Sequence, residues 1–108
     1  MRYLLLICTD GPVEASESET DATAWATEMD RRGIRLLGNR VRPAEDATTV
    51  RVRDGGVLVT DGPYAETKEQ MAGFDVIECA DLDEAIEVAA AHPMARFGMI
   101  EVRPFWVD

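Results

Sequence analysis

The order of the apolar segments along the chain is the feature that most restricts its fold. Once a short hairpin is set aside, the segments read strand, helix, strand, strand, helix, strand. That order is the split βαβ pattern of ferredoxin-like folds, in which two helices pack on one face of a four-stranded sheet. A chain of 108 residues has room for one domain, which we expect over residues 1–108. The sequence therefore predicts an α+β fold of ferredoxin-like topology with an inserted β-hairpin.

The strands are predicted from short apolar or alternating runs. They are expected at residues 3–8, 34–41, 73–79 and 99–105, with a hairpin formed by residues 50–53 and 57–59. The run from Tyr3 to Cys8 is almost continuously apolar, as in a central strand that is covered on both faces. In the hairpin, Asp54-Gly55-Gly56 supplies residues that accept the positive φ of a tight turn.

Two helices are predicted from apolar residues at helical spacing. The first stripe consists of Ala22, Trp25, Ala26 and Met29, and the second of Leu82, Ala85, Ile86, Ala89 and Ala90. Ser18 or Thr20 is expected to cap the first helix, and Gly33 to end it. Asp81 is expected to cap the second helix with Glu84 three residues later, and Pro93 to stop it.

Charge and composition exclude several classes of function. The net charge of −10 argues against binding to nucleic acid and to anionic membranes, both of which need a basic surface. No apolar run approaches the roughly 20 residues of a membrane span. The first apolar run is too short for a signal peptide and ends in a turn, so a cytoplasmic protein is expected. Cys8 and Cys79 both fall in apolar strand patterns and are expected to be buried thiols without a disulfide.

The last strand indicates an association surface. Ile100 and Val102 fall on one face of this strand and are expected to meet the helices. The opposite face carries Met99, Glu101, Arg103 and Phe105. A single layer of two helices leaves that mixed apolar and charged face uncovered. We therefore expect a homodimer in which a second subunit covers these residues.

A dense group of ionisable side chains follows the hairpin, in the stretch Asp61-Gly62-Pro63-Tyr64-Ala65-Glu66-Thr67-Lys68-Glu69. The predicted topology brings this stretch to the sheet edge where the first strand and the second helix end. We expect His92 and Asp61 as a catalytic proton-transfer pair, since histidine titrates near neutrality. The expected ligand-binding residues are Tyr64, Glu66, Lys68 and Asp10. The structural alternatives remain open: a helix C-terminal histidine, a turn aspartate, a packing tyrosine and solvated ion pairs.

The chain resembles one family over almost its whole length. The resemblance is carried by Tyr3-Leu4-Leu5-Leu6-Ile7, Thr48-Thr49-Val50-Arg51, residues 61–70, Gly73-Phe74, Asp81-Leu82-Asp83-Glu84-Ala85, His92-Pro93, Gly98 and Ile100-Glu101-Val102-Arg103-Pro104. Together these segments are similar to the DGPF branch of the YciI-like (YCII-related) family. Tyr64 stands where that branch usually has phenylalanine.

The resemblance implies a ferredoxin-like dimer that forms an α+β barrel, in a family whose members are largely uncharacterised. Some members are encoded beside extracytoplasmic-function sigma factors. In YciI-like relatives, a histidine on the first helix and an aspartate near the end of the second form a proposed catalytic pair. The present chain has no histidine on its first helix, and His92 falls roughly where that aspartate would be. The pair therefore does not carry over.

Two functional interpretations follow. The first is a small-molecule enzyme that works by acid–base chemistry without a cofactor. The second is a small-molecule-binding or regulatory module associated with an extracytoplasmic-function sigma factor. No metal site is expected, because one histidine and two strand cysteines do not supply a usual transition-metal site. The sequence also lacks a phosphate-binding glycine loop and a serine–histidine–acid motif.

Overall fold

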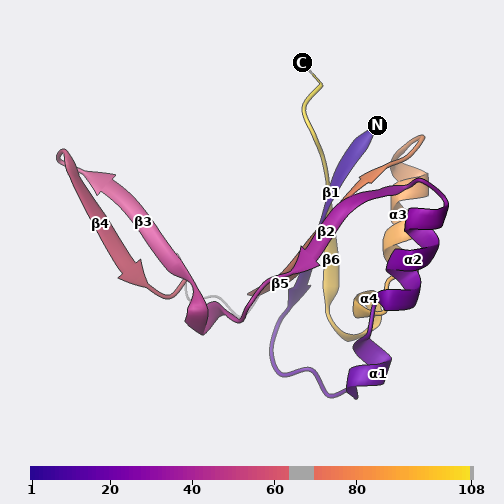
Figure 1. The fold of residues 1–108 in the computed structure, drawn as a ribbon, viewed down its shortest axis with the longest axis horizontal. Coiled ribbons are helices and arrows are strands. Elements are labelled where there is room, and N and C mark those ends of the chain that lie inside the picture. Colours follow the sequence, from indigo (N-terminus) through magenta and orange to yellow (C-terminus); the bar gives the residue numbers. More distant parts are fainter. Residues whose placement is uncertain (64–69, 108) are drawn as a thin grey trace.

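The computed structural model describes residues 1–63 and 70–107, and it contains a four-stranded antiparallel sheet in the order β2-β5-β1-β6 (Figure 1). Its strands are β1 (Arg2–Thr9), β2 (Arg35–Arg40), β5 (Gln70–Glu78) and β6 (Met99–Pro104). A separate two-stranded hairpin consists of β3 (Thr48–Arg53) and β4 (Gly56–Asp61). The strand order confirms the predicted α+β, ferredoxin-like architecture with an inserted hairpin. Five of the six strands begin and end within two residues of their predicted bounds, and β5 begins three residues earlier than expected.

Two main helices and three short ones lie on one side of the sheet or in the connections (Figure 1). They are α1 (Glu17–Thr20), α2 (Thr23–Arg31), η1 (Ala44–Asp46), α3 (Leu82–Ala90) and α4 (Met94–Phe97). The predicted helices correspond to α2 and α3, whereas α1 and α4 were not foreseen. Pro93 ends α3 as expected, and its φ of −58° also lets it start α4.

The two ends of α2 differ in how well the sequence predicts them. At its C-terminus, the Gly33 amide donates to the Asp30 carbonyl and the Ile34 amide to the Met29 carbonyl. With Gly33 at φ +70°, this is the Schellman arrangement that the glycine predicts. The predicted N-terminal cap is wrong. Neither Ser18 nor Thr20 caps α2, because these residues form α1, which Ser16 caps in a capping box with Glu19.

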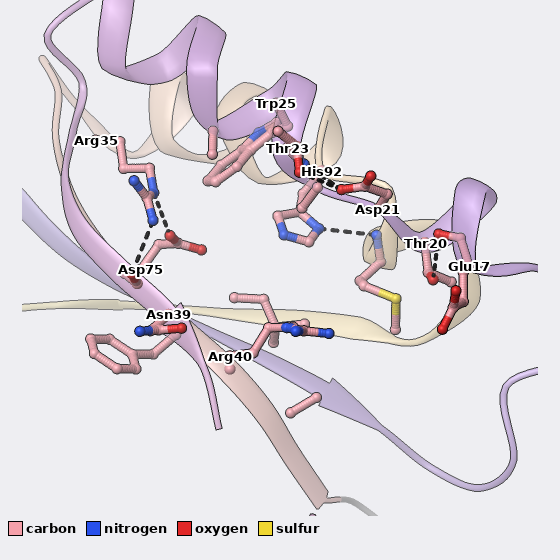
Figure 2. A pocket seen from close by; sticks show the side chains of 18 of the residues that line it. Glu17, Thr20, Asp21, Thr23, Trp25, Arg35, Asn39, Arg40, Asp75 and His92 are labelled. Carbon is pink, nitrogen blue, oxygen red and sulfur yellow. Dashed lines mark hydrogen bonds and ion pairs between the residues drawn. The ribbon is translucent and has the colours of Figure 1, made fainter. Parts of the chain in front are cut away.

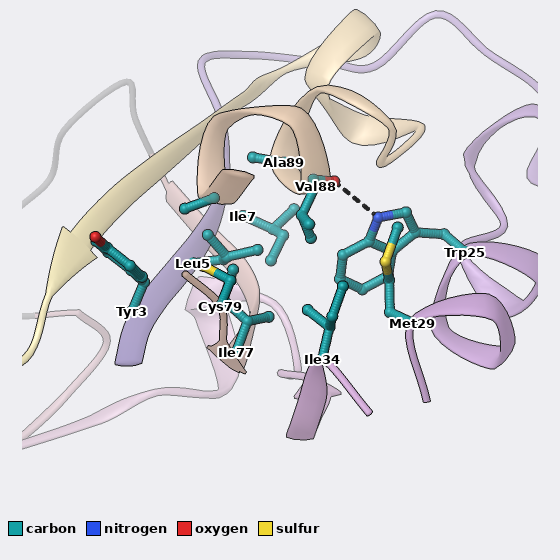
Figure 3. Close-up of a cluster of buried hydrophobic side chains, with 11 residues drawn as sticks. Tyr3, Leu5, Ile7, Trp25, Met29, Ile34, Ile77, Cys79, Val88 and Ala89 are labelled. Carbon is teal, nitrogen blue, oxygen red and sulfur yellow. Dashed lines mark hydrogen bonds between the residues drawn. The ribbon is translucent and has the colours of Figure 1, made fainter. Parts of the chain in front are cut away.

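The hydrophobic core lies between the sheet and helices α2 and α3 (Figure 3). Its largest fully buried side chains come from the central strands and α3: Leu5, Ile77 and Val88. Trp25 and Met29 of α2 join them, as the helical stripe predicts. The buried face predicted for α3 is correct only in part. Ala85 and Ala89 are buried together with Val88, whereas Leu82 and Ile86 are exposed.

Among the residues that the structure describes, no helix lies on the opposite face of the sheet (Figure 1). The β1 register places Leu4 beside Val76 and Arg103, and Leu6 beside Phe74 and Glu101. These side chains are half-buried or exposed and do not belong to the core. Ile100 and Val102 instead pack against the core, so the predicted division of the last strand into two faces is confirmed.

The hairpin extends away from the sheet and its helices (Figure 1). Asp54 and Gly55 adopt φ of 52° and 76°, which confirms the predicted tight turn. Cys8 and Cys79 lie toward opposite ends of the β1–β5 pair and form no disulfide. None of the helices in the described residues has both the length and the apolar character needed to cross a bilayer.

Candidate functional site

A cavity of about 890 Å³ opens between helices α1 and α2 and the β2–β5 side of the sheet (Figure 2). The sheet contributes Arg35, Asn39, Arg40 and Asp75 to its lining, and the helical side contributes Glu17, Thr20, Asp21, Thr23, Trp25, His92 and Met94. Apolar surface from Ile7, Ala26 and Ala72 completes it. The cavity therefore combines an apolar wall with several ionisable groups, as is usual for small-molecule sites.

His92 and Trp25 form the inner end of the helical wall. His92 follows α3, and its ring meets the Trp25 ring with centroids 4.7 Å apart at an interplanar angle of 61°. The Trp25 indole Nε1 donates to the Val88 carbonyl at 2.9 Å, which fixes the indole against α3. His92 itself is only 5% exposed. The sole histidine of the chain is thus held rigidly at the boundary of core and cavity.

The hydrogen bonding of His92 defines its protonation state. Its Nδ1 accepts a hydrogen bond from the Met94 amide at 3.0 Å. Nδ1 therefore carries a lone pair, and the proton of the neutral ring belongs on Nε2. Burial lowers the pKa of His92 from 6.5 to about 4. An imidazolium would also turn Nδ1–H toward the Met94 N–H. His92 is consequently a neutral hydrogen-bond donor near pH 7, rather than a base.

Arg35 and Asp75 form an ion pair at the other end of the cavity. Arg35 Nε donates to Asp75 Oδ1 at 2.8 Å, and its Nη2 donates to the Gly38 carbonyl at 3.0 Å. A third contact joins Arg35 Nη1 to Asp30 at 3.2 Å. Gly38 pairs with Asp75 across β2 and β5, and a Cβ at Gly38 would lie 1.9 Å from Asp75 Oδ1. The glycine therefore makes room for the carboxylate.

Asp75 is the most deeply buried carboxylate among the described residues, with only 6% of its surface exposed. Burial raises the pKa of Asp75, and the Arg35 guanidinium opposes that effect. Within the described chain, only Oδ1 has a hydrogen-bond partner. Figure 2 shows the second oxygen on the side away from Arg35. The structure thus places a buried, ion-paired carboxylate in a cavity, with one oxygen left for a ligand.

Arg40 extends along the sheet side of the cavity, below His92 (Figure 2). In the part of the chain that the structure describes, its guanidinium makes no hydrogen bond or ion pair. Its charge acts at longer range on Asp21. The pKa of Asp21 is lowered first by hydrogen bonds from Thr23 and also by Arg40. Arg40 is therefore a cation that faces the cavity with its donors available.

The residues predicted for the site are not all brought together. His92 lines the cavity, whereas Asp61 ends β4 opposite Thr48 in the hairpin and lines no part of it. Asp10 follows β1 and is also absent from the lining. Tyr64, Glu66 and Lys68 lie outside the described residues. The expected carboxylate partner of His92 is not seen among residues 1–63 and 70–107, where the Met94 amide holds Nδ1 instead.

Sequence reasoning missed Asp75, Arg35 and Arg40. A signal for Asp75 is present in the sequence: it shares the inward-facing side of its strand with Ile77, so a charge falls at a position expected to be buried. A buried charge of this kind is expected to be paired. Arg35 and Arg40 carry no such signal, because arginines at a strand's ends are common on solvated surfaces. For metals, no three His, Cys, Asp or Glu side chains of the described residues are grouped as ligands.

The fold and cavity define an α+β protein of ferredoxin-like topology with a polar pocket under its helices. The sequence profile of the YCII-related domain matches residues 1–107. The chain is also 39% identical over 105 residues to an uncharacterized protein of Rhizobium meliloti (strain 1021), with 80% of this chain and 83% of that protein covered. The chain belongs to the YCII-related family, as the sequence resemblance indicated.

Proposed function

We propose that this protein is an enzyme that acts on a small molecule by acid–base chemistry without a cofactor, and that the cavity under α1 and α2 is its active site. The observation that carries the proposal is Asp75, a buried carboxylate with a raised pKa and one oxygen without a partner among the described residues. Groups of this kind concentrate at functional sites, where burial tunes acids and bases toward neutral pH.

Three side chains have distinct roles in this proposal. Arg40 binds an anionic group of the ligand, for which a guanidinium without a competing partner is well suited. Asp75 accepts a proton from the bound molecule. The negative charge that the ligand then gains develops on an oxygen, which His92 stabilises by donating its Nε2–H. In this arrangement Asp75 takes the role that the sequence analysis gave to Asp61.

The experiment has two stages. A panel of small carboxylic acids is first screened for compounds that raise the melting temperature, since a ligand that binds only the folded state stabilises it. Each compound found is then incubated with the protein in D₂O, and loss of its C–H signal is followed by proton NMR. We expect wild-type protein to exchange a ligand proton, and Asp75→Asn to slow the exchange about 100-fold or more while still binding.

The matched control is Asp30→Asn, which removes the other carboxylate that contacts Arg35 but lies outside the cavity lining. This variant should exchange the proton at the wild-type rate. Equal slowing in both variants would show that Asp75 acts only by holding Arg35, and would contradict the proposal. Binding without any exchange in the wild type would favour the alternative, a small-molecule-binding or regulatory module associated with an extracytoplasmic-function sigma factor.

The residues that follow the hairpin in the sequence are a separate part of the proposal. We propose Tyr64, Glu66, Lys68 and Asp10 as further ligand contacts, on the charge density of residues 61–69 and the position of Asp10 after β1. The motif Asp61-Gly62-Pro63-Tyr64 supports placement in the DGPF branch. A cytoplasmic location is also proposed, and the free thiols of Cys8 and Cys79 support it, because disulfides are rare in reducing compartments.

We also propose a homodimer formed through the helix-free face of the sheet, with Met99, Glu101, Arg103 and Phe105 at the contact. The proposal is supported by the sequence of β1, which is apolar on both faces although helices cover only one of them. Leu4, Leu6, Phe74 and Val76 lie on the uncovered face without belonging to the core. Sedimentation at micromolar concentration should give twice the 11.9 kDa mass of one chain.

A further inference from the structure

The β3–β4 hairpin has one face made of four valines. Its register pairs Val50 with Val59 and Val52 with Val57, so all four side chains lie on the same face. These valines are between 59% and 67% exposed. The other face carries Arg51, Leu58 and Thr60. We propose that the valine face of each hairpin docks on a second copy of this chain, so that the hairpin is an arm of the dimer.

The described residues of the body do not cover the hairpin. None of the four valines belongs to the core, and the two strands pack essentially on each other within the described chain. Figure 1 shows the hairpin extending away from the sheet. At its base, Thr49 Oγ1 donates to the Gly62 carbonyl at 2.8 Å and the Gly62 amide donates to the Ala47 carbonyl at 2.7 Å. These hydrogen bonds close the base of the hairpin, and its tip lies away from the sheet.

A two-stranded hairpin with an exposed apolar face is expected to pack on another surface. A two-stranded hairpin is at best marginally stable in water, and apolar strand faces in monomers are normally covered. A face of four valines without a polar residue between them is typical of a contact surface rather than a solvated one. A partner that covers the valine face is therefore expected to stabilise the hairpin.

Two observations favour a second copy as that partner. The hairpin has no net charge, because Arg51 and Arg53 balance Asp54 and Asp61, whereas the whole chain carries −10. A second, acidic copy of the chain therefore repels the hairpin less than it repels the negatively charged remainder of the chain. In addition, the chain leaves a second apolar surface uncovered, the helix-free face of the sheet. A symmetric pair lets each copy offer an arm and an apolar surface to the other.

The proposal goes beyond the sheet-face homodimer and rests on it, and a pair of matched variants tests it. Val57→Gln with Val59→Gln changes the valine face, whereas Leu58→Gln with Thr60→Gln changes the opposite face of the same strand. Neither pair alters the charge. We expect the valine-face variant to raise the dimer dissociation constant about tenfold or more in sedimentation velocity, and the control to leave it nearly unchanged.

A second measurement identifies the contact directly. In dimers mixed from isotopically labelled and unlabelled chains, filtered NOE spectra should connect valine methyl protons of one copy to protons of the other. A wild-type monomer would overturn both the arm and the proposed homodimer. A wild-type dimer with equal dissociation constants for both variants, and no intermolecular valine NOEs, would overturn the arm alone and point to a different partner for the hairpin. Preserved NOEs between β3 and β4 show that each variant hairpin still forms.

Discussion

The body of the molecule and its hairpin use the same kind of strand in opposite surroundings. Leu5 in β1 is fully buried, with neighbours on both sides in the sheet and two helices above it. Leu58 in β4 has one neighbouring strand and is 50% exposed. Both segments are apolar enough to be predicted as strands. The difference shows that a strand pattern specifies local conformation and the division into faces, and leaves open what covers each face.

The reason for the difference is where each region obtains its order. The body is held by nonlocal packing, since β1 lies between β5 and β6, which follow it by more than 60 residues in the chain. The hairpin is held by a local turn at Asp54-Gly55 and by hydrogen bonds at its base. A region held locally can fold without a core of its own and present its side chains to another molecule. The two regions should therefore respond differently to substitution.

Two matched leucine substitutions test the comparison and should give the largest effect. Leu5→Ala removes a fully buried side chain and is expected to lower the free energy of unfolding by about 3–4 kcal/mol. Leu58→Ala removes an exposed one and should cost less than about 1 kcal/mol. Urea denaturation measures both values. A Leu58→Ala loss as large as that of Leu5→Ala would show that the outer face of the hairpin is buried too.

Much of the fold can be predicted from the sequence because its signals are local. The alternation in residues 50–59 with an Asp-Gly turn predicts the hairpin, and Gly33 predicts the end of α2. Local signals fail where two of them compete. Ser18 and Thr20 have cap chemistry, but Ser16 with Glu19 forms a capping box first and takes these residues into α1. Leu82 and Ile86 fit a helical stripe, yet the smaller Ala85 and Ala89 face the sheet.

The candidate site is less predictable, because its residues meet only through tertiary structure. His92 lies at a cavity, where its partners among the described residues are Trp25 and the Met94 amide rather than a carboxylate. Asp75 reaches the cavity because Gly38 leaves space for it on the next strand, a relation between residues 37 positions apart. A dense run of charges such as residues 61–69 draws attention in a sequence, whereas a single buried charge in an apolar strand is easily overlooked.

His92 should give the next largest effect, through the pH dependence of stability. Its pKa is about 4 in the folded protein and 6.5 as a free side chain, so the unfolded chain binds more protons between these values. The free energy of unfolding should therefore rise by roughly 3 kcal/mol on account of His92 between pH 4 and pH 6.5, and level off above that.

The variant His92→Asn isolates this contribution, because the asparagine carbonyl can still accept from the Met94 amide and does not titrate. Subtracting its stability curve from that of the wild type removes most effects of the carboxylates, including Asp75, whose raised pKa acts in the opposite direction over acidic pH. A difference curve that is flat from pH 4 to pH 6.5 would mean that His92 titrates alike in folded and unfolded chains, contrary to its burial.

Substitution of two glycines by alanine compares the body with the hairpin through the smallest change. Each substitution adds one methyl group to a residue with a positive φ. Gly33 ends α2 in the body at φ +70°, and Gly55 forms the hairpin turn at φ +76°; an added Cβ meets no atom within 4 Å at either position. Alanine at each site should therefore cost about 1 kcal/mol, from the left-handed backbone alone.

Gly33→Ala should show this loss in global unfolding, because α2 belongs to the cooperative core. Gly55→Ala should leave global unfolding of the monomer almost unchanged and instead speed amide hydrogen exchange in β3 and β4, because the hairpin opens without the body. Measurements below the concentration at which copies associate keep the two regions independent. If Gly55→Ala lowers global stability as much as Gly33→Ala does, the hairpin unfolds together with the body, and the separation between a nonlocally packed body and a locally held arm is wrong.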